Sequence, residues 1–116
     1  MSMWKGQRIE EVEVTDAHAG SEHNVLLDVR EADEWQAGHA PGARWVPLGE
    51  LEKVRFQLPM NRTIVCVCRS GGRSAKAAAE LVQMGFRAVN MTGGMKSWAQ
   101  QGLPVVHDDG SPGEVI

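Results

Sequence analysis

The residues best suited to chemistry lie in one short stretch, the cysteine loop (residues 68–73), which reads Cys-Arg-Ser-Gly-Gly-Arg. A thiol becomes a strong nucleophile when it ionises, and a loop that leads into a helix favours ionisation. The first backbone N–H groups of a helix have no partner within the helix, and the helix dipole adds partial positive charge. Arg69 and Arg73 add two cations. We therefore expect Cys68 to be a nucleophile in a loop that binds anions.

The small residues of the cysteine loop are expected to shape this anion site. Gly71 and Gly72 permit backbone conformations that other residues avoid, so the loop can curve closely around a ligand. The backbone N–H groups between Ser70 and Ser74 would then point at the anion. Both serines also have a second interpretation, since each could donate a hydrogen bond to the sulfur or simply cap the helix.

Arg73 ends the loop, and we expect it to have a structural role. Its planar guanidinium suits a two-pronged pair with a carboxylate such as Asp28, which would hold the loop closed. Cys66 differs from Cys68 because it lies inside an apolar run. We expect it to pack in the core, and two cysteines one residue apart on a strand are poorly placed for a disulfide.

The elements that must position the loop alternate between strands and helices. The residues before Cys68 form an apolar, β-branched run typical of a buried strand, and the alanine-rich residues after the loop are typical of a helix. Strands are expected at residues 9–14, 24–29, 44–47, 63–67 and 87–91, and helical segments near residue 15 and at 31–36, 48–58, 74–84 and 95–101. This alternation predicts an α/β fold with a mostly parallel, five-stranded sheet and helices on both faces. The functional loops should gather at the carboxyl ends of the strands.

Length and composition limit the class of protein. The 116 residues fit one domain, expected at residues 9–106, with an N-terminal arm at 1–8 and a flexible, polar tail at 107–116. The net charge of −3 argues against a nucleic-acid-binding protein with a broad basic face. The two cysteines are too few for a disulfide scaffold, and the four histidines show no metal-ligand spacing, so we expect neither a metal nor another cofactor. No run resembles a signal peptide or a membrane span, which favours a cytoplasmic protein without membrane partners.

Three motifs, in order along the chain, resemble those of the rhodanese-like sulfurtransferases. The first is Leu27-Asp28-Val29-Arg30-Glu31, followed by Glu34-Trp35 and by Gly38-His39-Ala40-Pro41-Gly42-Ala43. The second is the cysteine loop itself. The third is Gly93-Gly94-Met95, Trp98 and Gly102-Leu103-Pro104-Val105. The three motifs span most of the chain, so the resemblance does not depend on the loop alone.

This resemblance implies a rhodanese-like fold and a sulfurtransferase that works through a persulfide on Cys68. The donor is expected to be a small anion, thiosulfate first, because family members that use thiosulfate have a cation after the cysteine, where Arg69 stands here. The acceptor is expected to be cyanide in the test tube, and a thiol or a small redox or sulfur-acceptor protein in the cell. Asp28 and Arg30 are implied as structural support. His39 is implied to be a turn residue, and the protein is expected to be a monomer or a weak dimer.

Two other functions stay open at this point. The same fold could serve as a sulfur carrier or binding module without catalysis. A cysteine phosphatase or an arsenate reductase also places a thiolate in an anion-binding loop. In tyrosine phosphatases and related dual-specificity phosphatases, however, five residues separate the cysteine from the arginine. Only four residues lie between Cys68 and Arg73. The smaller ring suits a sulfur atom better than a phosphate group.

Overall fold

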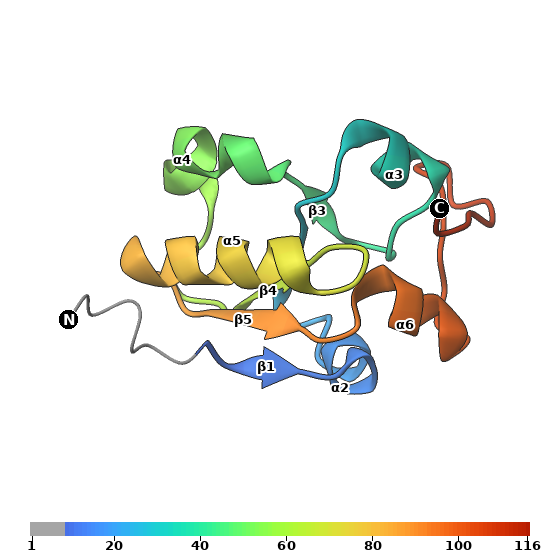
Figure 1. The fold of residues 1–116 in the computed structure, drawn as a ribbon, viewed down its shortest axis with the longest axis horizontal. Helices are drawn as coiled ribbons and strands as arrows, with labels where there is room; N and C mark the ends of the chain where they lie inside the picture. Colours follow the sequence, from blue (N-terminus) through green and yellow to red (C-terminus); the bar gives the residue numbers. More distant parts are fainter. Residues whose placement is uncertain (1–8) are drawn as a thin grey trace.

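Five parallel strands form the centre of the computed structural model, which describes residues 9–116 (Figure 1). The expected arm at residues 1–8 lies outside the described residues. The order in the sheet is β1-β5-β4-β2-β3, and every neighbouring pair is parallel, which confirms the predicted five-stranded sheet. The strands are β1 (Glu11–Val12), β2 (Val25–Asp28), β3 (Arg44–Trp45), β4 (Ile64–Val67) and β5 (Ala88–Met91). The strand that leads into the cysteine loop, β4, is therefore the middle one.

Helices cover both faces of the sheet (Figure 1). On one face, α5 (Gly72–Gln83) and α4 (Leu51–Val54) pack over alternate residues of β4, including Ile64 and Cys66. On the other face, α2 (Val14–Ala19) and α6 (Gly94–Gln100) pack over Val65 and Val67. A strand between two helical layers is buried on both faces and therefore needs apolar residues at every position. All four residues of β4 are buried, which explains its unbroken apolar run. The remaining helix, α3 (Ala32–Ala37), follows β2 and begins with a capping box.

The single helix expected at residues 48–58 is wrong, because three short pieces take its place. They are the 3₁₀ turn η1 (Leu48–Glu50), α4, and the 3₁₀ turn η2 (Arg55–Gln57). The apolar spacing still serves the core, since Leu51 and Leu58 are buried. Gly49 lowers helix propensity near the start of the segment, and the tighter 3₁₀ turns bring the two leucines onto one layer without a continuous helix.

The polar composition of residues 107–116 predicted a flexible tail. In the structure, however, this segment packs against the rest of the domain. An antiparallel bridge joins His39 to Val106, and Val106 also bridges to Pro112. Glu114 N–H donates to the carbonyl oxygen of Ala37 at 2.9 Å, so the segment returns to the end of α3. The reason is a close backbone approach, because a Cβ atom on Gly38 would overlap the backbone of Glu114. Among residues 9–116, no helix combines the length and apolar character that crossing a bilayer requires.

Candidate active site

Cys68 stands where β4 ends, and polar hydrogens point at its sulfur. The backbone N–H of Gly71 donates to Cys68 Sγ at an N···S distance of 3.1 Å, and the Ser74 hydroxyl lies 3.2 Å from the same atom. Gly71 adopts a left-handed conformation with φ of 109°, as the sequence predicted for a loop that curves around a ligand. Gly72 has no such conformation; it is simply the first, exposed residue of α5.

The environment of Cys68 favours its thiolate. Burial acts to raise the pKa of the thiol, but it is outweighed by hydrogen bonds from the Ser74 hydroxyl and from the backbone N–H groups of Ser74, Gly71 and Ser70. The pKa of Cys68 therefore lies below that of an ordinary thiol. The residue is only 1% exposed, so the sulfur is recessed behind its loop.

The beginning of α6 holds the cysteine loop in this shape. The N–H groups of Met95 and Lys96, which have no partner within α6, donate to the carbonyl oxygens of Cys68 and Arg69 at 2.8 and 2.9 Å. In a peptide unit the N–H points away from the C=O, so fixing the Arg69 carbonyl turns the Ser70 N–H toward the sulfur. Gly94 permits this contact, because it has a φ of 59° and a Cβ atom there would overlap the same two carbonyl groups.

Arg73 pairs with a carboxylate, as predicted, but Asp28 was the wrong partner, because the carboxylate belongs to Glu34 of α3. Two parallel hydrogen bonds of 2.7 and 2.9 Å join the guanidinium to the two carboxylate oxygens. The pKa of Glu34 falls to about 2, chiefly because of the side-chain hydrogen bond from Arg73. Arg73 therefore ties α5 to α3, and most of its charge is neutralised beside the loop.

Asp28 is not free to pair with Arg73 because Arg30 occupies it. The Nε and Nη2 atoms of Arg30 lie 2.8–3.1 Å from the Asp28 carboxylate, and Nη2 also donates to the Gly38 carbonyl at 2.8 Å. Both residues are fully buried at the end of β2. Within residues 9–116, Arg30 Nη1 is the buried side-chain polar atom that lacks a hydrogen-bond partner. The pair connects β2 to the turn that follows α3. Asp28 is also the neighbour in the sheet of Val67, which precedes Cys68, so the pair lies where it can support the cysteine loop.

Arg69 and Ser70 are exposed on the rim of the loop. The Arg69 side chain turns toward the end of the chain, where its Nε donates to the carbonyl oxygen of Ile116 at 2.9 Å. No described hydrogen bond joins the Arg69 side chain to Cys68, so its part in binding a donor stays a prediction.

Asn90 also belongs to the site, although it lies outside the three sequence motifs. Its side chain is buried on β5, where Oδ1 lies 2.6 Å from the Ser74 hydroxyl and Nδ2 donates to the Gly71 carbonyl at 3.2 Å. It therefore contacts two groups that surround the sulfur. A polar residue inside an otherwise apolar strand was the available signal, because such a group normally has buried partners.

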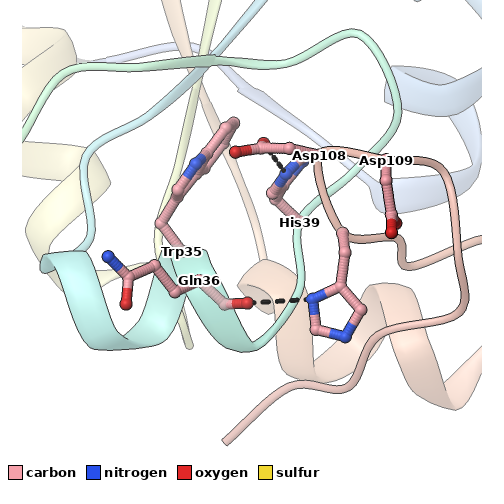
Figure 2. A pocket seen from close by; sticks show the side chains of 6 residues that line it. Trp35, Gln36, His39, Asp108 and Asp109 are labelled. Atoms are coloured by element: carbon pink, nitrogen blue, oxygen red, sulfur yellow. Dashed lines mark hydrogen bonds and ion pairs between the residues drawn. The ribbon is translucent and has the colours of Figure 1, made fainter.

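A separate hollow, which Cys68 does not line, lies beside α3 (Figure 2). His39 stacks on Trp35, with ring centroids 3.6 Å apart, and its Nε2 lies 2.8 Å from Asp108 Oδ1. The neighbouring His107 bonds through Nδ1 to the Gln36 carbonyl. These contacts place His39 between α3 and the terminal segment, so it holds a turn, as the resemblance implied. Within the described residues no group of three or more His, Cys, Asp or Glu side chains is placed to hold a metal ion.

Cys66 is buried in the core, as predicted. Burial, together with the charge of Cys68, raises its pKa to about 12. The two cysteines therefore differ sharply in acidity although they share one strand. Both are free thiols, and both contribute to the apolar layer under α5.

A parallel α/β sheet with an acidic thiol in an amide-lined loop defines a class of cysteine-dependent proteins that bind anions. Comparison with known proteins identifies the family: the model of the rhodanese-like domain matches residues 11–101, and the chain belongs to this family. It is 38% identical over 93 residues to a sulfurtransferase of Allochromatium vinosum, covering 79% of this chain and 87% of that protein. It is also 38% identical over 110 residues to thiosulfate sulfurtransferase 16, chloroplastic, of Arabidopsis thaliana, covering 80% and 89%.

A solved structure shows the same fold. A rhodanese-related protein from Thermoplasma volcanium superposes with a TM-score of 0.80 at 31% identity, covering 84% of this chain and 97% of that one. Some curated relatives are much longer, and the chain spans 40% and 26% of two of them. The fold and the family predicted from the three motifs are thus confirmed.

Proposed function

We propose that this protein is a sulfurtransferase in which Cys68 accepts a sulfur atom from thiosulfate and passes it to a thiol. The observation that carries this proposal is the convergence of the Gly71 N–H and the Ser74 hydroxyl on Cys68 Sγ, at 3.1 and 3.2 Å. Donors that surround a sulfur stabilise negative charge on it without needing to reorganise during the reaction. The sulfurtransferase names of two relatives agree with this assignment.

The first half-reaction is a displacement at sulfur. The Cys68 thiolate attacks the outer sulfur of thiosulfate, a new S–S bond forms, and the S–S bond of the donor breaks. Sulfite leaves with the bonding electron pair, and a persulfide with a negative terminal sulfur remains on Cys68. The recessed position of Cys68 favours a slender donor whose reacting atom is terminal. The exposed Arg69 is proposed to attract the dianion.

The second half-reaction regenerates the thiolate. An acceptor thiolate attacks the terminal sulfur of the persulfide, and the bonding pair returns to Cys68 Sγ. Cyanide would react in the same way to give thiocyanate. Two separate half-reactions predict ping-pong kinetics. In the cell the acceptor is proposed to be a small thiol or a redox protein.

Two observations weaken the phosphatase alternative. The guanidinium of Arg73 is engaged with Glu34 at 2.7 and 2.9 Å, instead of pointing into the loop. Arg73 is therefore not available to hold a tetrahedral anion over the sulfur. The loop is also one residue shorter than in the phosphatases considered above.

Mass spectrometry of the intact protein tests the proposal. After incubation with thiosulfate and removal of the excess, the protein should gain one sulfur atom, and Cys68→Ser should gain none. Cys66→Ala serves as the matched control and should load normally. Steady-state turnover with small thiols then separates an enzyme from a sulfur carrier, and a faster rate with thiosulfate than with mercaptopyruvate would identify the donor class. A wild-type protein that never gains sulfur would exclude the proposal.

A further inference from the structure

The Ser74 hydroxyl faces two hydrogen-bond acceptors but has only one hydrogen to donate. Its Oγ lies 3.2 Å from Cys68 Sγ and 2.6 Å from Asn90 Oδ1. The contact with Asn90 is the shorter one, and Ser74 is fully buried, so water does not supply a second donor. Cys68 and Asn90 therefore compete for the same hydrogen.

The amide of Asn90 cannot turn to relieve this competition. Its Nδ2 lies 3.2 Å from the Gly71 carbonyl oxygen and 3.4 Å from Glu11 Oε2, and both of these atoms are acceptors. Rotating the amide by half a turn would place its own oxygen against them. The side chain is only 3% exposed and β5 holds its backbone, so Oδ1 remains directed at Ser74.

The protonation state of Cys68 decides whether Cys68, Ser74 and Asn90 can all form their hydrogen bonds. When Cys68 is a thiol, its S–H can donate to Ser74 Oγ, and the Ser74 hydrogen goes to Asn90. When Cys68 is a thiolate, it draws the Ser74 hydrogen to itself, which leaves two oxygens facing each other without a hydrogen between them. A buried acceptor without a donor is costly.

We propose that Asn90 is a positioning residue that competes with Cys68 for the Ser74 hydrogen, so that the thiolate is stabilised less than it would be without Asn90 and the balance moves toward the states in which Sγ carries no charge. One such state is the resting thiol. The other, which rests on the proposed function, is the persulfide, because its charge resides on the terminal sulfur. The thiolate is the state in which Asn90 Oδ1 loses its hydrogen, and this cost promotes conversion of the thiolate to the persulfide.

Other charged groups near the sulfur are the same in every variant used to test this proposal. Arg73 approaches from α5, with its charge balanced by Glu34 of α3. Cys66, which lies on the strand that leads to Cys68, is replaced by alanine in all of these variants. Glu11 of β1 stands behind Asn90.

The test measures how the rate of Cys68 alkylation by iodoacetamide depends on pH, in a Cys66→Ala background with a single thiol. Asn90→Val should lower the apparent pKa of Cys68 by about one unit, because Ser74 is then free to donate to the sulfur. Ser74→Ala should raise it. In the Ser74→Ala protein, adding Asn90→Val should change nothing, because the proposed path runs through the hydroxyl.

Two results would overturn the proposal. An Asn90→Val protein whose Cys68 pKa is unchanged or higher would show that Asn90 only supports the loop through Gly71. A fall in pKa that persists without Ser74 would show that Asn90 acts on the sulfur by another route. Thermal unfolding checks that each variant is folded, and Asn90→Ala replaces Asn90→Val if the valine does not fit. Since alkylation needs no sulfur donor, the experiment stays decisive even if the proposed function fails.

Discussion

Replacing Glu34 with Gln should destabilise the protein by separating α3 from α5. The Glu34 carboxylate accepts two hydrogen bonds from Arg73, at 2.7 and 2.9 Å, and one from the Glu31 N–H at 3.0 Å. Glutamine keeps the length of the side chain and one carbonyl oxygen, so the cap of α3 can survive. The two-pronged pair with Arg73 cannot, because the amide nitrogen offers hydrogens instead of lone pairs.

The expected loss follows from the acidity of Glu34. A pKa lowered from its ordinary 4.5 to about 2 corresponds to an upper limit of about 3 kcal/mol of interaction with the carboxylate. The Arg73 side chain is 37% exposed, so water and salt screen part of this interaction. We therefore expect Glu34→Gln to lower the free energy of unfolding by about 1–2 kcal/mol near neutral pH, and the melting temperature by about 4–8 °C.

The pH dependence of this loss provides the critical measurement. Because the pKa of Glu34 is lower in the folded state, the carboxylate contributes its full stabilisation above the unfolded pKa and loses it as the pH falls through the folded value. Urea unfolding of wild type and Glu34→Gln should therefore differ most above about pH 5, and the difference should shrink steadily toward about pH 2.

Asp33→Asn provides the matched control, since it removes a charge of the same sign from the first turn of α3 at an exposed position. It should change stability by less than about 0.5 kcal/mol. If the two variants lose the same stability, or if the loss caused by Glu34→Gln is independent of pH, the pair with Arg73 is not what joins the two helices.

Further predictions concern the backbone contacts and the second cysteine. Gly94→Ala should lower the free energy of unfolding by more than about 3 kcal/mol in urea, since its Cβ atom would overlap the cysteine loop. Gly102→Ala is the control: its Cβ atom would meet open space, so the left-handed backbone alone should cost about 1 kcal/mol. Cys66 should remain unlabelled when native protein is treated with iodoacetamide near neutral pH and should be labelled in urea; peptide mapping that finds it labelled before unfolding would contradict its raised pKa of about 12. Gly38→Ala should release residues 107–116 and speed proteolysis there, and unchanged cleavage would show that the segment is not held by this contact.

Local patterns were sufficient to predict the central part of the molecule. The apolar run before Cys68, the glycine at position 71 and the alanine-rich segment after the loop each favour one local structure, and they are adjacent in sequence. The structure therefore has β4, the loop and α5 where the pattern placed them. The buried state of Cys66 also followed from its apolar neighbours alone.

Contacts between distant segments were harder to predict. Arg73 needed a carboxylate, but the sequence offered several, and only the fold shows that Arg30 already occupies Asp28 while Glu34 faces α5. Asn90 gave a weak signal, because a single polar residue in a short strand does not reveal its partners. The docking of residues 107–116 depends on a backbone approach at Gly38, which composition does not encode.

The hydrogen bonds from α6 to the cysteine loop have a consequence for synthesis. On the ribosome, the chain emerges with Cys68 well before Met95 and Lys96, whose N–H groups hold the carbonyls of the loop. The first strand, β1, likewise can pair only after β5, its neighbour in the sheet, has been made. A nascent chain that has exposed Cys68 but not yet α6 therefore lacks the hydrogen bonds that fix the loop around the sulfur, and the site is complete only after α6 has been made and has packed against the loop.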